Sequence, residues 1–391
     1  MKILMVAPGG SVHSLKPLKL LLNEKNIKVI FMDEIDPFPD GKANYKFVPI
    51  RLLRKKRTLS KIFGYKLLYF IEDLYLSIYF KKVINKYSPD IIHVHWIDER
   101  ILYLRKAGAK PIIASAWGTD INQHFALEAD THLKELKGKC LNAADLIIVD
   151  SKIVDKRCSL LAGNPLRFET LHLGIDTDIF KQGYQKEVIK LKEQLKINDD
   201  YKIILSARGW QSYYNQEFIL QAFSMILEEF PKTILLFKLH NCSKVQSLVN
   251  MIKTRVDKLN IKNNIRWIDD VPLESLPVVY NMCDLIVNYP SMDTLPVTFM
   301  EAAACCRQVV SCKLPTYEGT FSEKYFTLVE GSDIYKLVDA LKNNLGDSSS
   351  IRSDVLKEAR AFIINNYDQK FYLNKLLNIY NEMIKEIKVS A

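Results

Sequence analysis

Residues 284–304 read Asp-Leu-Ile-Val-Asn-Tyr-Pro-Ser-Met-Asp-Thr-Leu-Pro-Val-Thr-Phe-Met-Glu-Ala-Ala-Ala. The run Leu285–Tyr289 is short and apolar, which predicts a buried strand. After a polar loop, Pro296 suits the first turn of a helix, because the N–H that proline lacks is one that a helix leaves unpaired there. The stretch therefore predicts a strand, a loop and a helix in succession, the unit from which parallel α/β sheets are built.

Short apolar runs of the same kind alternate with helical-period segments along the chain, a pattern that predicts parallel sheets with crossover helices. In the first half, we expect strands at Lys2–Ala7, Lys28–Met32, Tyr45–Val48, Ile91–His95, Pro111–Ser115, Leu146–Val149 and Glu169–His172. In the second half, we expect them at Lys202–Ala207, Thr233–Leu239, Ile265–Ile268, Leu285–Tyr289, Val309–Cys312 and Thr327–Val329. The predicted fold class is therefore α/β, with two doubly wound, Rossmann-like units.

The length of 391 residues is too great for one ordinary core and suits two α/β domains. The join falls near Gly174–Gln185, so we expect a first domain at residues 1–175 and a second at residues 176–370. A final helical stretch at residues 371–391 is expected to pack back on the first domain. Two such domains facing each other imply a cleft between them, and open α/β sheets bind ligands beyond the carboxyl ends of their strands.

The composition is that of a folded globular chain, with 48% hydrophobic and 26% charged residues. No segment reaches the roughly 18 uninterrupted apolar residues that a membrane span needs, and the apolar start of the chain is too short for a signal-peptide core. The seven cysteines form no Cys-x-x-Cys pair and mostly lie in apolar runs. We therefore expect a cytoplasmic location, with no disulfides and no structural zinc.

The formal net charge of +10 is concentrated in residues 42–86, which contain twelve Lys or Arg against two acids, Glu72 and Asp73. Phe and Tyr residues are interleaved with these charges between Phe63 and Phe80. A basic, aromatic-rich helix suits the surface of an anionic membrane, so we expect peripheral contact with the inner face of the plasma membrane. The alternative is a helix that buries its aromatic rings and exposes a basic face. Nucleic acid is not an expected partner, because no RNA- or DNA-binding signature accompanies the charge.

The loop and helix after Leu285–Tyr289 carry the groups that a sugar nucleotide requires. The amides of Val297 and Thr298 open the predicted helix, and free amides at a helix N-terminus suit a diphosphate. Glu301 lies one turn further on the same face, where a carboxylate accepts hydrogen bonds from a ribose. Asp293 precedes the helix and is placed to hold sugar hydroxyls. The alternative is that Glu301 is an ordinary surface residue and Asp293 a turn former.

The spacing Asp293-x7-Glu301, followed by three alanines, resembles the Glu-x7-Glu motif of retaining GT-B glycosyltransferases of family 4. The resemblance covers nearly the whole chain. It implies that a nucleotide-sugar donor binds to the second domain, with its ribose at Glu301 and its sugar at Asp293. The donor loop includes Leu295 and Pro296. Other GT-B readings remain open, namely a sugar-nucleotide 2-epimerase, an inverting transferase, or a non-catalytic sugar-nucleotide-binding or scaffold partner.

Members of that family place an Arg and a nearby Lys after the first strand of the second domain, where they neutralise the leaving diphosphate. Arg208 in Ser206-Ala-Arg-Gly-Trp matches the Arg, but Tyr214 stands where the Lys falls. Lys238, at the end of the strand Thr233–Leu239, is a candidate to replace it. The alternative is that Lys238 only extends to solvent. The resemblance also assigns recognition of the nucleotide base to the backbone at Val271.

The first domain supplies the acceptor side in this resemblance. Gly9 and Gly10 close the first strand, where the absence of side chains lets a ligand approach the backbone. His95 ends the fourth strand, and Asp120 follows the fifth in Ala116-Trp-Gly-Thr-Asp. This last stretch resembles the family's His-Gly-x-Asp, with Trp117 in place of the His. We expect His95 to be catalytic and Asp120 to hold an acceptor hydroxyl; His13 and His124 are further candidates, and the alternative for each His is a structural role.

The resemblance implies retention of anomeric configuration by front-face transfer, in which the acceptor hydroxyl gives its proton to the departing phosphate. This path requires no strong protein base. We expect no cofactor and no metal requirement: the Asp-x-Asp of Asp176 and Asp178 lies in the interdomain linker and is assigned to turn and helix capping. The expected acceptor is a glycan or a lipid-linked saccharide, in the synthesis of a bacterial surface polysaccharide.

Overall fold

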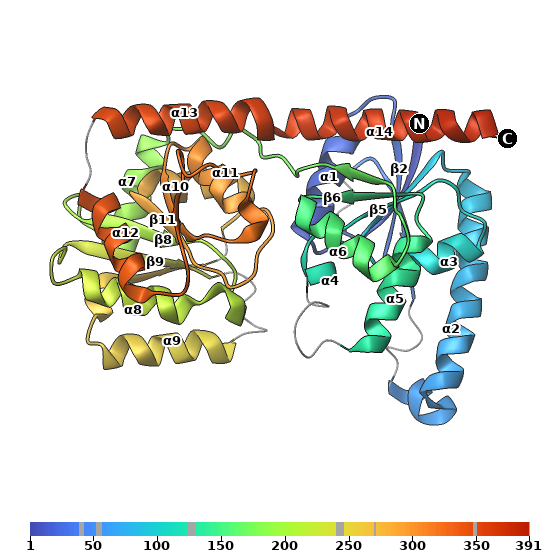
Figure 1. Ribbon diagram of the computed structural model, residues 1–391, viewed down its shortest axis with the longest axis horizontal. Coiled ribbons are helices and arrows are strands. Elements are labelled where there is room, and N and C mark those ends of the chain that lie inside the picture. The colour runs from blue at the N-terminus through green and yellow to red at the C-terminus, as the bar shows by residue number, and fades with distance from the viewer. Residues whose placement is uncertain are drawn as a thin grey trace. The chain divides into compact units, whose positions relative to one another are not determined.

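The computed structural model describes residues 1–38, 43–51, 57–122, 130–239, 246–269, 271–346 and 350–390. The chain divides into two compact units: unit 1 comprises Met1–Leu173 with Tyr372–Ala391, and unit 2 comprises Gly174–Phe371. The sequence places these boundaries at residues 175 and 371. Each unit has its own parallel sheet with helices on both faces, which confirms the predicted α/β class with two doubly wound units (Figure 1).

The sheet of unit 1 has the strand order β3-β2-β1-β4-β5-β6-β7, with every neighbouring pair parallel. Its strands are β1 (Lys2–Val6), β2 (Lys28–Asp33), β3 (Lys46–Pro49), β4 (Ile91–His95), β5 (Ile112–Ser115), β6 (Leu146–Val149) and β7 (Phe168–Thr170). Its helices are α1 (Val12–Leu22), α2 (Arg57–Tyr87), α3 (Arg100–Lys106), α4 (Thr119–Asn122), α5 (Thr131–Asn142), α6 (Lys152–Ala162) and most of α14 (Gln369–Ser390). The strand order reverses between β1 and β4, the position at which open α/β sheets bind ligands.

Both faces of this sheet are buried, because successive side chains of a strand point to opposite sides. In β1, Leu4 and Val6 join a core with residues of α2, α3, α5 and α6. Ile3 and Met5 join a second core with residues of α1 and α14. Burial on both sides explains why the strands read as continuous apolar runs in the sequence.

The sheet of unit 2 has the order β10-β9-β8-β11-β12-β13 and is also parallel throughout. Its strands are β8 (Lys202–Ser206), β9 (Thr233–Lys238), β10 (Ile265–Ile268), β11 (Leu285–Asn288), β12 (Gln308–Cys312) and β13 (Thr327–Val329). Its helices are α7 (Gln185–Leu195), α8 (Gln216–Ile226), α9 (Gln246–Lys258), α10 (Leu276–Met282), α11 (Val297–Ala304), α12 (Ile334–Gly346) and α13 (Ser350–Tyr367). The order reverses between β8 and β11, so the loops after these two strands lie side by side.

Each strand expected from the sequence is present in the described residues, with ends that differ by two residues at most. The largest difference is at β7, which ends at Thr170 instead of His172. This strand lies at the edge of its sheet and pairs only with β6, from Ile147↔Phe168 to Val149↔Thr170. Because β6 ends at Val149, no partner backbone continues the ladder further.

None of the helices in the described parts of the chain is long and apolar enough to cross a membrane.

Candidate functional site

The carboxyl ends of β8 and β11 bring Arg208 and Asp293 together in unit 2. Arg208 follows β8, Asp293 lies in the loop after β11, and these strands are neighbours in the sheet. Nη2 of Arg208 donates to Oδ1 of Asp293 at 2.8 Å and to the hydroxyl of Tyr214 at 2.7 Å. Both charged side chains are largely buried, with 16% and 8% of their surface exposed. The two residues that the sequence assigns to phosphate and sugar thus form an ion pair.

Arg208 keeps its positive charge in this environment. Burial disfavours the charged guanidinium, but Asp293, Tyr214 and Tyr317 outweigh burial, and the pKa of Arg208 is raised on balance. The ring of Tyr214 also lies 4.4 Å from Cζ of Arg208, a cation–π contact. Nε of Arg208 is buried and has no hydrogen-bond partner among the described residues. A buried N–H without an acceptor has the capacity to bind a ligand oxygen or a water molecule.

Asp293 is fixed from several directions. Its Oδ1 also accepts from the amide of Thr294 at 3.0 Å, and its Oδ2 accepts from the hydroxyl of Tyr317 at 3.3 Å. The hydroxyl of Thr316 donates to the Asp293 carbonyl at 2.8 Å. Burial and the neighbouring Asp293 carboxylate raise the pKa of Tyr317 well above its ordinary value, so this hydroxyl stays protonated and donates. The alternative of a turn former therefore describes only part of the role of Asp293. Its carboxylate bonds to the amide of Thr294, and it is also a largely buried charge that pairs with Arg208.

Glu301 lies in α11 beneath the same loop. It is only 6% exposed, so the alternative of an ordinary surface residue is wrong. Tyr280 of α10 donates its hydroxyl to Oε2 of Glu301 at 2.7 Å. Burial and the carboxylate of Glu301 raise the pKa of Tyr280 well above its usual range, which keeps it a donor. Tyr280 therefore orients the carboxylate, a role that the sequence did not indicate.

The N-terminus of α11 differs in one detail from its prediction. Pro296 is the N-cap residue, with extended backbone angles of φ −72° and ψ 107°, and the helix begins at Val297 instead. Val297 and Thr298 form the first turn as expected, and Oγ1 of Thr298 is buried with no hydrogen-bond partner in the described structure. Leu295, 9% exposed, packs into the core below the loop. The amide of Phe299 donates to the carbonyl of Pro296 at 3.0 Å, which leaves the amides of Val297 and Thr298 as the donors without a partner inside the helix.

Lys238 and Val271 lie at the same edge of the sheet. The register Ser206↔Phe237 places Lys238 beside Ala207, the residue before Arg208. Lys238 is half-buried, and its carbonyl accepts from the indole of Trp210 at 3.0 Å. Val271 is half-buried against the core that contains α10 and α11. Lys238 ends β9 and Val271 follows β10 in the sheet of unit 2, and their roles in the donor site stay predictions.

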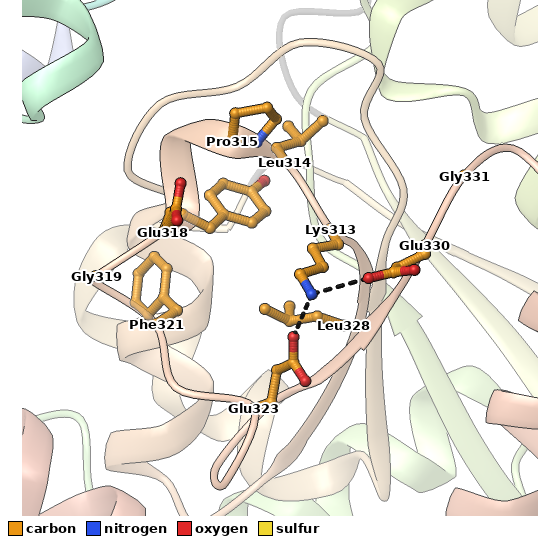
Figure 2. A pocket seen from close by; sticks show the side chains of 11 residues that line it. Lys313, Leu314, Pro315, Glu318, Gly319, Phe321, Glu323, Leu328, Glu330 and Gly331 are labelled. Carbon is orange, nitrogen blue, oxygen red and sulfur yellow. Dashed lines mark hydrogen bonds and ion pairs between the residues drawn. The ribbon is translucent and has the colours of Figure 1, made fainter.

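A pocket of about 690 Å³ lies beyond the carboxyl ends of β12 and β13 (Figure 2). Figure 2 shows Lys313 between two carboxylates, with Nζ 2.7 Å from Glu323 and 2.9 Å from Glu330. One lysine and three glutamates line the pocket, which gives the lining a net charge of −2 and disfavours a phosphate. Tyr317 joins this pocket to the ion pair, because its ring lines the pocket and its hydroxyl reaches Asp293. Lys313 directly follows β12, a position that the sequence analysis did not single out.

Gly9 in unit 1 has a structural explanation. Its amide donates to Oδ2 of Asp33, at the end of β2, at 2.7 Å. A Cβ at Gly9 would lie 2.5 Å from the carbonyl oxygen of Ile35, so no larger residue fits. Gly9 is therefore required by the close approach of the chain's own backbone at Ile35. A Cβ at Gly10 would meet nothing within 4 Å, so Gly10 faces open space.

His95 is part of a buried ring cluster at the carboxyl ends of β4 and β5. It is fully buried, and the backbone of His13 lies within hydrogen-bonding reach of its ring. Its centroid lies 4.2 Å from that of His93 and 5.6 Å from that of Trp117. Burial, with a smaller contribution from His93, lowers the pKa of His95 well below its ordinary value. The ring of His13 also stacks on Trp117, with 5.1 Å between the centroids, and His124 lies outside the described residues.

Asp120 is fully buried and binds the backbone. Its Oδ2 accepts from the amide of Ile97 and its Oδ1 from the amide of Trp117, both at 3.0 Å. Burial raises the pKa of Asp120 to about 6, although these amides oppose the rise. The bond to Ile97 fixes the residue before it, Trp96, whose φ of 107° is uncommon for a bulky side chain. Asp120 thus holds the loop after β4 and the loop after β5 in one arrangement.

Asp176 and Asp178 stabilise a turn, in agreement with their assignment as capping residues. Oδ1 of Asp176 accepts from the amide of Asp178 at 3.0 Å, and Asp178 pairs with Lys370 at 3.0 Å. Across the described ranges, no three His, Cys, Asp or Glu side chains are grouped so that they would hold a metal ion.

Comparison with known proteins covers most of the chain. The sequence model of the family described as "Glycosyl transferases group 1" matches residues 187–367, and that described as "Glycosyl transferase 4-like" matches residues 2–151. D-inositol 3-phosphate glycosyltransferase of Corynebacterium glutamicum (strain R) is 20% identical over 293 residues, 71% of this chain and 70% of that protein.

Two solved structures show the same fold at low sequence identity. A glycosyltransferase from Rickettsia africae ESF-5 has a TM-score of 0.79 and 16% identity, and the match covers 98% of each chain. Anabaena HepE in complex with UDP and glucose has a TM-score of 0.76 and 14% identity, with 98% of this chain and 100% of that chain covered.

Proposed function

The chain belongs to the glycosyl transferases group 1 family and has the GT-B fold, and we propose on this basis that it moves a sugar from a nucleotide-sugar donor to a glycan or lipid-linked acceptor. Membership of this family makes the chain a glycosyltransferase. A fold hosts many reactions, so the donor site is argued from the residues of unit 2.

The unpartnered Nε of Arg208 is the observation that supports donor binding most strongly. A guanidinium binds two phosphate oxygens through adjacent N–H groups, and here Nη2 is already oriented by Asp293 and Tyr214. Nε is buried and lacks an acceptor among the described groups. A diphosphate oxygen supplies the missing acceptor. The amides of the first turn of α11 add the positive end of a helix dipole to the same edge of the sheet.

The ion pair then changes its partner when the donor binds. Asp293 and Arg208 neutralise each other at 2.8 Å. A diphosphate beside Arg208 competes for that guanidinium, and Asp293 becomes available for hydroxyls of the transferred sugar. Binding of the charged diphosphate and recognition of the sugar are thereby coupled through Arg208 and Asp293. Lys238 is proposed as the second cation near the diphosphate, since Tyr214 occupies the place of the family's Lys.

Glu301 is assigned to the ribose of the donor. A carboxylate has about four acceptor positions, so the bond from Tyr280 orients it without exhausting it. Val271 is assigned to the base, through its backbone. We further propose that the donor binds without a metal ion or other cofactor, because Arg208 and the helix amides supply the positive charge that a diphosphate needs.

We propose transfer with retention of anomeric configuration. Departure of the diphosphate is assisted by Arg208, and the acceptor hydroxyl passes its proton to the leaving phosphate oxygen. Such a step depends on positioning and charge stabilisation more than on a protein base. The neutral, buried state of His95 is consistent with this, because burial lowers its pKa and disfavours the protonated form. Its proposed role is to shape the acceptor side beside Trp117.

The proposed acceptor is a glycan or lipid-linked saccharide in bacterial surface polysaccharide synthesis, met at the cytoplasmic face of the plasma membrane. Residues 42–86 support this location, since twelve basic residues against two acids suit an anionic lipid surface. Described cysteines that are unpaired and buried, such as Cys140 and Cys283, support a reducing compartment.

A donor screen followed by product analysis tests the proposed function. Purified chain is mixed with UDP-, GDP-, ADP- and dTDP-sugars, and the thermal midpoint is followed, because a ligand that binds only the folded state raises it. The donor that binds is then incubated with lipid-linked saccharides, and proton NMR reports the anomeric configuration of the product. We expect one donor class to bind and the configuration to be retained. An inverted or epimerised product would contradict the mechanism, and the absence of binding by any donor would contradict the proposal.

A further inference from the structure

Helix α2 of unit 1 carries apolar side chains on two opposite faces. Its inner face packs into the core through Leu68, Leu76, Phe80 and Val83. Its outer face exposes a second apolar set, here called the outer stripe: Leu67, Phe70, Ile71, Leu74, Tyr75 and Ile78, which are 50%, 67%, 37%, 54%, 36% and 48% exposed. Figure 1 shows α2 along the outside of unit 1.

The spacing of the outer stripe places it on one face. Intervals of 3, 1, 3, 1 and 3 residues follow the helical repeat, so these side chains lie in one continuous band. At 1.5 Å per residue, the band is roughly 17 Å long. An exposed helix face normally carries polar residues, and a contiguous apolar patch marks a surface that contacts a partner.

The outer stripe ends in positive charge. Lys81, Lys82 and Lys86, in the last turns of α2, are exposed, and the first two continue the same face of the helix. The helix contains two acids: Glu72 is fully buried, and Asp73 is neutralised by Lys106 at 2.7 Å. The outer face of α2 in the described residues is therefore apolar and basic, without an unpaired acid.

An anionic lipid surface matches both properties, and we propose that the outer stripe docks α2 on an anionic bilayer. The apolar side chains enter the boundary between headgroups and acyl chains, and the lysines contact the anionic headgroups. Phe70 and Tyr75 bring aromatic rings to the depth where such rings partition. The assignment deepens the membrane location proposed above and is independent of the transfer chemistry, since it rests on α2 alone.

Charge disfavours a second copy as the occupant. A second copy would need acids to pair with Lys81 and Lys82, but in the described part of α2 the outer face carries no unpaired acid. Like charges brought together without such partners are destabilising. Nucleic acid is also a poor match, because its phosphates do not cover an apolar stripe.

Vesicle co-sedimentation of the full chain tests this proposal. Phosphatidylcholine vesicles with and without phosphatidylglycerol are compared in the absence of any donor, so a failure here leaves the proposed transfer untouched. We expect binding to the anionic vesicles, and a loss of roughly tenfold or more in the triple variant Leu67→Ser, Phe70→Ser, Leu74→Ser. The matched control is Leu133→Ser with Leu160→Ser, on α5 and α6, which are 44% and 73% exposed and should bind as wild type.

The charge contribution is measured in the same way. Replacing Lys81, Lys82 and Lys86 with Gln should weaken anionic binding by roughly 100-fold, since each lysine near an anionic surface contributes about a factor of five. The control replaces exposed lysines on other elements of unit 1 with Gln: Lys139, Lys152 and Lys388. Wild-type binding by the α2 variant, or equal loss in the control, would overturn the assignment.

A single substitution measures how deeply the outer stripe enters the bilayer. Phe70→Trp should show a blue-shifted emission on anionic vesicles and quenching by brominated lipid, without removing apolar surface. Light scattering of the chain without vesicles tests the remaining alternative, a dimer formed through the outer stripe. A dimer that the triple variant abolishes, together with no vesicle binding, would assign the stripe to a second copy and overturn the proposal.

Discussion

Arg208 and Asp293 face each other in unit 2 with 2.8 Å between Nη2 and Oδ1, although they come from loops after different strands. The pair concentrates one positive and one negative charge in a largely buried place. Its guanidinium still has a buried N–H without an acceptor among the described residues. We interpret the pair as part of a donor site in which the carboxylate of Asp293 and a diphosphate compete for the guanidinium of Arg208.

Replacement of Asp293 by Asn should destabilise the chain and strengthen its response to a nucleoside diphosphate. The variant leaves a mostly buried guanidinium without its counterion, which costs roughly 3 kcal/mol. A bound diphosphate restores the missing negative charge, so the thermal shift caused by the cognate nucleoside diphosphate should be larger in the variant than in wild type. Turnover should fall, because the sugar contact is lost.

The matched control for this prediction is Asp200→Asn, an exposed acid of unit 2 that pairs with Lys232 at 2.6 Å. Exposed pairs contribute little to stability, so the stability and thermal shift of this variant should resemble wild type. A smaller nucleotide shift in Asp293→Asn than in wild type would show that Asp293 does not compete with phosphate for Arg208.

Tyr280→Phe should raise the KM for the donor by about tenfold with a small change in kcat. The substitution keeps the ring volume and removes the hydroxyl that orients Glu301, a hydrogen bond to a charged group that contributes about 1.5–3 kcal/mol. Steady-state kinetics with varied donor measures the effect. Tyr335→Phe, a tyrosine of unit 2 that is 67% exposed, is the control. An unchanged KM for the donor would contradict the assignment of Glu301 to the ribose.

Acid should destabilise the chain through its buried histidines. Burial lowers the pKa of His93 to about 3 from 6.5, because its ring nitrogens are enclosed between Tyr380 and Ser115. Below pH 6.5 the unfolded chain takes up a proton that the folded chain excludes, so stability is complete above this pH and falls as the pH decreases toward 3. At pH 5 the loss from His93 is roughly 2 kcal/mol.

Denaturant unfolding between pH 5 and pH 8 measures this loss. The double variant His93→Gln, His95→Gln should be less stable than wild type at pH 8 and should show a flatter dependence below pH 6.5. Asp120 acts in the opposite direction, since its raised pKa of about 6 makes its contribution largest at low pH and smaller as the pH rises through 6. If the double variant is as acid-sensitive as wild type, groups other than His93 and His95 cause the loss of stability at low pH.

Asp120→Asn should destabilise the chain by about 2 kcal/mol and change the tryptophan signal. An amide side chain has one acceptor oxygen, so either the Ile97 or the Trp117 amide loses its partner in a buried place. Near-UV circular dichroism should report the movement of Trp96 and Trp117. The control Asp130→Asn keeps an N-cap acceptor for α5 and should be nearly neutral. Unchanged stability in Asp120→Asn would show that the two loops are fixed by other contacts.

The strands were predictable from sequence because parallel strands buried on both faces read as continuous apolar runs. The positions of Asp293 and Glu301 were also predictable, since both follow from a local strand, loop and helix. Their partners were not. Tyr280 lies 21 positions from Glu301 and Tyr317 lies 24 positions from Asp293, and no local pattern encodes a contact made by the packing of separate helices and loops.

Unit 1, which is expected to bind the acceptor, shows the same limit of prediction from local sequence. The glycine at position 9 was read as an approach to a ligand, but Ile35 of the next loop fills that space. The basic segment was predictable as a charge pattern, whereas the division of α2 into a buried and an exposed apolar face depends on which side meets the sheet. His124 lies outside the described residues, so its expected role stays a prediction.

The dissociation constant of the cognate nucleotide-sugar, measured by calorimetry for wild type, Arg208→Gln and Arg255→Gln, tests the central claim most directly. Arg255 is a 42% exposed arginine of unit 2 whose Nε lies 4.0 Å from a carboxylate oxygen of Glu217, and it serves as the matched control. We expect one donor class to bind wild type and the control equally, and to bind Arg208→Gln at least tenfold more weakly, because charge-assisted hydrogen bonds to the diphosphate are lost. Equal affinity of all three proteins, or no binding of any nucleotide-sugar to wild type, would contradict the assignment of this site to the donor.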